Sequence, residues 1–195
     1  MTNTIPGYIT EIECQQLRTI FAPYNKVGAI GVEIGSLHGR SSYEISKTIP
    51  LGKLYCIDGW DGYDSSSPDM TADDCARHNY PVVGTICTLA FFKENTKDCE
   101  NITTYKTHSP RGVLNWQGTV DFVFLDALHA NPSDWDNIEF WLPRLNRGGR
   151  FVGHDFYPNR NQWPDVYDNV RRLEQQLGKA VINPAGTSLW YFDIL

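Results

Sequence analysis

The sequence lacks several features that mark specialised classes of protein. It has five cysteines, but no Cys-x-x-Cys pair and no histidine at zinc-finger spacing from one. This speaks against a disulfide framework or a cysteine-ligated zinc, and the dispersed thiols predict a reduced, cytoplasmic protein. No stretch approaches about 18 consecutive apolar residues, so we expect no membrane-spanning helix. Residues 1–12 do not show the basic start and apolar run of a signal peptide.

Positive charge is also scarce. The 17 lysines and arginines are outnumbered by 23 aspartates and glutamates, which gives a formal net charge of −6. Nucleic-acid binding depends on a basic surface, so this balance favours a small-molecule partner over nucleic acid. The length of 195 residues predicts a single domain over residues 1–195, and the composition leaves a homo-oligomer open.

Strand-like and helix-like segments alternate from about residue 29 onward. This alternation predicts a Rossmann-like three-layer α/β sandwich with a mostly parallel, seven-stranded sheet and helices on both faces. The last two strands have no helix between them, so we expect an antiparallel strand at the C-terminal edge. The expected strands are 29–34, 54–58, 102–107, 121–126, 150–153, 180–182 and 188–192, and the expected helices are 41–49, 132–142 and 164–177.

One segment is too long for a simple connection in such a fold. Residues 59–82 are polar, rich in aspartate and interspersed with aromatic residues. Loops of this length are usually functional lids or disordered segments. We interpret the segment as a lid, with a mobile insertion or a subunit contact as the alternatives.

The clearest candidate binding site follows the first expected strand. In the run VEIGSLHGRSS (residues 32–42), Gly35 and Gly39 allow a sharp turn and close approach to a ligand. In open α/β sheets, ligands bind outside the carboxyl ends of the strands. Asp58 ends the second strand, where an acid can accept both ribose hydroxyls of an adenosine-containing cofactor. Its alternative role is to cap the next turn.

The glycine pattern also discriminates between cofactors. The turn lacks the Gly-x-Gly-x-x-Gly that brings a pyrophosphate close to the backbone, and Glu33 would place negative charge beside that pyrophosphate. A cationic sulfonium cofactor, S-adenosylmethionine, therefore fits better than NAD. Two alternatives remain: an NAD-dependent oxidoreductase, and a non-catalytic binding or assembly protein that retains the fold.

Two aspartates follow the fourth and fifth expected strands and should meet at the same edge of the sheet. Asp126 and Asp155 have no obvious cationic partner between them, which suits a divalent cation such as Mg²⁺. Such an ion could hold a substrate hydroxyl and lower its pKa. His129 could then take the proton. The alternatives are that Asp126 is a plain substrate or cofactor contact and that His129 is a helix-capping or solvated residue. His154 is either a further metal ligand or a structural neighbour.

Ser109 closes the third expected strand together with His108. The hydroxyl of Ser109 could lie near the adenine of a cofactor, or it could cap the following helix.

Taken together, four segments resemble a known family. They are similar to class I S-adenosylmethionine-dependent methyltransferases, most of all to the macrocin- and mycinamicin-type sugar O-methyltransferases. The four segments are VEIGSLHGRSS, LYCIDGW (54–60), DFVFLDALHA (121–130) and GGRFVGHD (148–155). The resemblance covers roughly residues 28–157. It implies O-methylation of a hydroxyl on a sugar or other small molecule. It also implies roles for the residues that match the motifs: Glu33, Gly35, Ser36 and Ser41 at the methionine part of the cofactor, Asp58 at the ribose, Asp126 and Asp155 at a metal, and His129 as the base. His154 stands where the family has a second acid.

Overall fold

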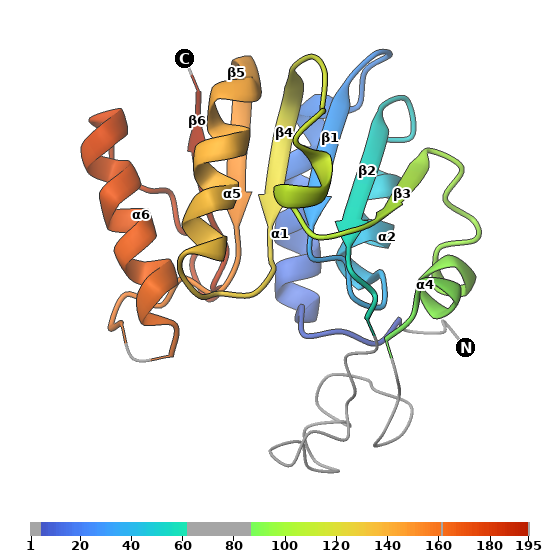
Figure 1. Ribbon diagram of the computed structural model, residues 1–195, viewed down its shortest axis with the longest axis horizontal. Helices are drawn as coiled ribbons and strands as arrows, with labels where there is room; N and C mark the ends of the chain where they lie inside the picture. The colour runs from blue at the N-terminus through green and yellow to red at the C-terminus, as the bar shows by residue number, and fades with distance from the viewer. Residues whose placement is uncertain (1–4, 62–86, 161, 195) are drawn as a thin grey trace.

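Six strands form one mixed sheet in the part of the chain that this computed structural model describes, residues 5–61, 87–160 and 162–194 (Figure 1). The strand order is β3-β2-β1-β4-β5-β6. The first five strands are parallel, and β6 is antiparallel to β5. The strands are β1 (Ile30–Ile34), β2 (Lys53–Asp58), β3 (Ile102–Lys106), β4 (Val120–Leu125), β5 (Leu145–Gly153) and β6 (Trp190–Asp193).

The sheet reverses its winding direction at β1. This strand pairs with β2 on one side and with β4 on the other. The chain therefore leaves β1 and β4 toward different sides of the sheet, and the carboxyl ends of the two strands border a crevice. Any ligand site of this fold is expected there.

Helices cover both faces of the sheet (Figure 1). α1 (Glu11–Phe21) and α2 (Arg40–Thr48) pack against each other on one face, and α5 (Ser133–Trp141) and α6 (Pro164–Leu177) lie on the opposite face. α4 (Leu89–Asn95) adds Phe92 to the core on the α1 side. Short 3₁₀ helices cover Ala22–Tyr24, Arg111–Val113 and Leu142–Arg144.

β4 shows why the central strands read as continuous apolar runs. Phe122 and Phe124 pack into the core on the α1 and α2 side, and Val123 and Leu125 pack into the core on the α5 and α6 side. A strand that is buried on both faces needs apolar residues at nearly every position. This rigid centre holds the carboxyl ends of β1 and β4 in place.

The prediction of seven strands is wrong for the described residues. Residues 180–182 form only one bridge, between Ile182 and Tyr191. Side chains take the place of a regular ladder here, because Glu174 accepts the N–H of Val181 and the Asn183 amide donates to the carbonyls of Thr187 and Leu189.

Other boundaries also differ from those expected. β5 begins at Leu145 rather than at residue 150, because Leu145 already pairs with Val120 of β4. The register then shifts before Arg150 pairs with Phe122, and Gly148 (φ +79°) lies in the irregular stretch between the two pairs. The helices α1 and α4 were not expected. Of the proposed lid at 59–82, only residues 59–61 lie within the described residues.

No helix in the described ranges has both the length and the apolar character needed to cross a lipid bilayer.

Candidate active site

A cavity of about 1110 Å³ opens at the carboxyl ends of the parallel strands. Ligand pockets usually measure roughly 300–1,000 Å³, so this one has room for more than a single small ligand. Nine of the ten residues that we predicted for the site line it, and Glu33 does not. The nine are Gly35, Ser36, Ser41, Asp58, Ser109, Asp126, His129, His154 and Asp155.

The turn after β1 passes very close to the end of β4. Gly35 has φ +85°, and a Cβ atom there would lie 1.9 Å from the carbonyl oxygen of Asp126. The Gly35 N–H donates to the carbonyl of Ile57 in β2 (3.0 Å). Only glycine combines this backbone conformation with this close approach. The turn then enters α2 through Gly39, which is also left-handed at φ +94°.

Asp58 connects this turn to the end of β2. Its Oδ2 accepts the N–H groups of Ser36 (2.9 Å) and Leu37 (3.0 Å), and its Oδ1 accepts that of Trp60 (2.7 Å). The Trp60 bond is the turn cap that we considered as the alternative role. A carboxylate offers about four acceptor positions, so Asp58 retains capacity for a ribose hydroxyl at the cavity wall.

Glu33 supports the turn from behind instead of facing a ligand. Its side chain is 0% exposed and accepts hydrogen bonds from the hydroxyls of Ser36 (2.8 Å), Ser41 (2.6 Å) and Ser42. Burial raises the pKa of Glu33, and the hydroxyl donors oppose that rise. Because the Ser41 hydroxyl is directed at Glu33, both residues shape the turn that a cofactor would contact.

Ser109 lies on the cavity wall beyond β3. Its Oγ accepts a hydrogen bond from the Trp141 indole (2.9 Å), and its carbonyl accepts one from Asn137 (3.2 Å). The next 3₁₀ helix begins after Pro110 without a side-chain cap, so the capping role considered for Ser109 is wrong.

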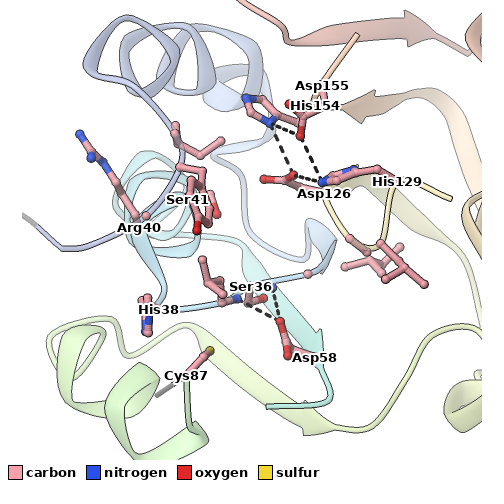
Figure 2. Close-up of a pocket in the computed structure, with 18 of the residues that line it drawn as sticks. Ser36, His38, Arg40, Ser41, Asp58, Cys87, Asp126, His129, His154 and Asp155 are labelled. Atoms are coloured by element: carbon pink, nitrogen blue, oxygen red, sulfur yellow. Dashed lines mark hydrogen bonds and ion pairs between the residues drawn. The ribbon is translucent and has the colours of Figure 1, made fainter. Parts of the chain in front are cut away.

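Four ionisable residues form a cluster at the other end of the cavity (Figure 2). The Nδ1 atom of His154 lies 3.1 Å from Oδ2 of Asp155 and 3.5 Å from Oδ1 of Asp126. The Nε2 atom of His129 lies 3.1 Å from Oδ2 of Asp155 and 3.7 Å from Oδ1 of Asp126. The structure thus brings together Asp126, His129, His154 and Asp155, as we predicted, although they follow two different strands.

His154 provides the cationic partner that we did not find between the two aspartates in the sequence. It is 5% exposed, and its Nε2 atom lies 3.1 Å from Oε1 of Glu13. Burial alone would lower the pKa of His154, but the surrounding carboxylates of Asp126, Asp155 and Glu13 outweigh it and raise that pKa well above its usual value. His154 can balance the aspartates as an imidazolium, or it can ligate a cation through Nδ1 after losing that proton.

Two residues behind this cluster were missed. Glu13 in the first turn of α1 and Ser188 just before β6 both contact His154 Nε2. A sequence signal for α1 exists, because Thr10 and Glu13 form a reciprocal capping box. Nothing local in the sequence links Ser188 to the site, since its partners are distant along the chain.

Comparisons with known proteins identify the family to which this chain belongs. Residues 32–156 match a family model described as a methyltransferase domain. The chain belongs to this methyltransferase family. The matched segment runs from β1 to just beyond β5 and includes Asp58, Asp126 and Asp155. The protein is therefore an S-adenosylmethionine-dependent methyltransferase of class I.

Solved structures share the fold of this methyltransferase at low identity. A protein assigned to the caffeoyl-CoA O-methyltransferases of Staphylococcus aureus is 13% identical, with a TM-score of 0.65 over 97% of this chain and 85% of that one. The O-methyltransferase TomG of Streptomyces achromogenes, which acts in tomaymycin synthesis, is 13% identical, with a TM-score of 0.60 over 96% and 81%. An rRNA methylase of Streptococcus thermophilus is 15% identical, with a TM-score of 0.58 over 97% and 99%.

The names of these neighbours refer to different classes of acceptor, so the neighbours establish the fold and leave the acceptor open. No curated protein matches the chain.

We expect Gly35→Ala to abolish binding of S-adenosylhomocysteine, because the added Cβ would collide with the carbonyl of Asp126. The overpacking should cost roughly 1–3 kcal/mol beyond the backbone strain. Gly118→Ala is the matched control, since Gly118 has φ +86° and nothing lies within 4 Å of its Cβ position. Calorimetric titration and urea unfolding of both variants measure these effects. Equal losses in the two variants would contradict a specific close approach at Gly35.

His38 should make stability depend on pH. It is 0% exposed, and burial lowers its pKa from 6.5 to about 4. A depressed histidine pKa contributes stability that is present above the unfolded pKa and is lost as pH falls toward the folded one. Between about pH 7 and about pH 4.5, the wild type should therefore lose about 2 kcal/mol more free energy of unfolding than His38→Gln. Urea unfolding at both pH values checks this, and parallel losses would exclude His38 as the source.

Proposed function

We propose that this methyltransferase transfers the methyl group of S-adenosylmethionine to a hydroxyl of a small molecule, as a sugar O-methyltransferase of the macrocin and mycinamicin type does. The single observation that best supports the proposal is the arrangement of one cavity. Its first end offers the glycine turn and Asp58, and its second end offers His129 beside two carboxylates. A cofactor and an acceptor could therefore meet between the two ends.

The first end suits the cofactor. The turn formed by Gly35 and Ser36 would contact the methionine part, Asp58 would accept the ribose hydroxyls, and Ser109 would lie near the adenine. With these contacts in place, the cofactor would supply its methyl group to an acceptor held at the second end. Holding both reactants in one geometry would supply much of the rate enhancement.

At the second end, His129 would act as the base. Its Nε2–H would donate to Oδ2 of Asp155 (3.1 Å), which leaves Nδ1 to accept the proton of the acceptor hydroxyl. The acceptor oxygen would then bond to the methyl carbon as the carbon–sulfur bond breaks in line. The products are the methyl ether, neutral S-adenosylhomocysteine and a protonated His129.

A divalent cation fits the same end of the cavity. One nitrogen of His154 and one oxygen each of Asp126 and Asp155 lie within 4.8 Å of one another, and these three residues would hold the ion. Mg²⁺ is the ion that we named from the paired aspartates. When bound there, a divalent ion would polarise the acceptor hydroxyl and lower its pKa.

The net charge of −6 supports a small-molecule or sugar acceptor over nucleic acid. We also propose a cytoplasmic location, on the basis of the dispersed cysteines.

Calorimetric titration tests the cofactor assignment. S-adenosylhomocysteine should bind in the micromolar range and NAD should not, and Asp58→Asn should weaken binding of S-adenosylhomocysteine at least about tenfold by removing a charged acceptor. Transfer of labelled methyl groups to a panel of glycosides and phenols then tests the reaction. Binding of NAD alone would overturn the proposal, and binding of S-adenosylhomocysteine without transfer to any hydroxyl would favour the non-catalytic alternative.

We expect His129→Ala to retain the affinity for S-adenosylhomocysteine and to lower kcat by about 10²- to 10⁴-fold, because it removes the group that takes the proton. The rate should recover partly as pH rises, since hydroxide replaces the lost base. The affinity for S-adenosylhomocysteine serves as the internal control. An unchanged kcat with a confirmed acceptor would exclude His129 as the base.

A further inference from the structure

We infer that the cation site formed by Asp126, His154 and Asp155 is built for a first-row transition-metal ion in preference to Mg²⁺, and that Glu13 of helix α1 is the positioning residue that sets this preference through the His154 ring. The inference deepens the proposed function and rests on it only for the presence of a cation at this end of the cavity.

The spacing of the donor atoms suits one shared ion. Ligand bonds of about 2.1 Å place two ligands at right angles roughly 3 Å apart. His154 Nδ1 lies 3.1 Å from Asp155 Oδ2 and 3.5 Å from Asp126 Oδ1. These separations are close to those of ligands that already surround a common centre.

Glu13 determines which nitrogen of His154 faces the aspartates as a ligand. Its Oε1 lies 3.1 Å from His154 Nε2 and is the natural acceptor for the Nε2–H of a neutral ring. A neutral imidazole with its proton on Nε2 has its lone pair on Nδ1, which points at Asp126 and Asp155. Such carboxylate–histidine contacts orient metal-binding histidines and raise the basicity of the ligand nitrogen.

Glu13 itself is held in place from both sides. Its Oε1 accepts the N–H (3.0 Å) and the hydroxyl (3.1 Å) of Ser188, and its Oε2 accepts the N–H (2.9 Å) and the hydroxyl (2.8 Å) of Thr10. Glu13 is 5% exposed. A buried carboxylate with this many donors is a rigid support, so the orientation of the His154 ring is fixed before any ion binds.

The donor set then determines which metals are preferred. Mg²⁺ favours sites built only from oxygen ligands, whereas imidazole nitrogen suits transition metals. Because His154 contributes one nitrogen to two carboxylates, it shifts the site toward ions such as Co²⁺, Fe²⁺ or Zn²⁺. His129 is not one of the three residues whose atoms converge, so it remains available as the base.

The test is calorimetric titration of the chelator-treated full chain with Co²⁺ and, separately, with Mg²⁺, followed by S-adenosylhomocysteine in the same samples. Three variants are compared with the wild type. His154→Asp replaces nitrogen with oxygen, Glu13→Gln removes the charge behind the ring, and Glu11→Gln is the matched control. Glu11 lies in the same helical turn as Glu13, but its side chain is 64% exposed and pairs with Arg18 and Arg40.

We expect the wild type to bind Co²⁺ more tightly than Mg²⁺, and His154→Asp to lower the ratio of the two affinities at least about tenfold. Glu13→Gln should weaken Co²⁺ binding by about 10- to 100-fold while S-adenosylhomocysteine binding persists. Glu11→Gln should leave Co²⁺ binding unchanged. The His154→Asp result decides the matter if Glu13→Gln fails to fold.

An affinity ratio that His154→Asp leaves unchanged would overturn the inference, as would a wild type that binds neither ion. If S-adenosylhomocysteine still binds in those samples, only the inference about the metal fails. Loss of S-adenosylhomocysteine binding in the wild type would instead remove the proposed function.

Discussion

The close approach of the turn after β1 to the end of β4 is the constraint on which the rest of the site depends. Gly35 leaves no room for a side chain against the Asp126 carbonyl, and the Asp126 N–H donates to the Ile34 carbonyl (2.9 Å). This contact joins the two strands at the point where the sheet changes its winding direction. As a result, the cofactor turn and the first residue of the ionisable cluster belong to one rigid unit, and the distance between the two ends of the cavity is set by the sheet.

Charge balance organises the second end. Three carboxylates surround the buried His154 ring, and no single strand supplies them, because Asp126 follows β4, Asp155 follows β5 and Glu13 lies in α1. Asp155 adopts φ +60° and His129 adopts φ +53°, both unusual for residues other than glycine. Backbone strain of this kind often occurs at functional sites, where the surrounding structure holds it in place.

The segment that matches the family and the residues that contact His154 from behind come from different parts of the chain. The match covers residues 32–156, whereas Glu13 and Ser188 lie before and after it. The matched core therefore contains the residues that would contact cofactor and acceptor, and the flanking segments contain those that orient His154. In the metal preference inferred above, residues outside the matched segment would therefore act on the site through His154.

The sequence by itself determined the class of fold and nine of the residues that line the cavity. Apolar runs and the residues that bound them were enough to predict the strands β1, β2 and β4 and the helices α2, α5 and α6. Burial on both faces of a strand and the ends of a helix both leave signals in the local sequence. The same signals misled us at residues 180–182, where side-chain hydrogen bonds replaced a strand ladder.

Only the tertiary structure decided how the charged groups pair. It placed Glu33 behind the turn, showed His154 as the cation between the aspartates, and brought Glu13 to it across 141 positions of sequence. Pairing of this kind depends on which distant segments pack together. Contacts between charged groups on distant segments leave no periodic pattern in the sequence, so the sequence alone does not reveal them.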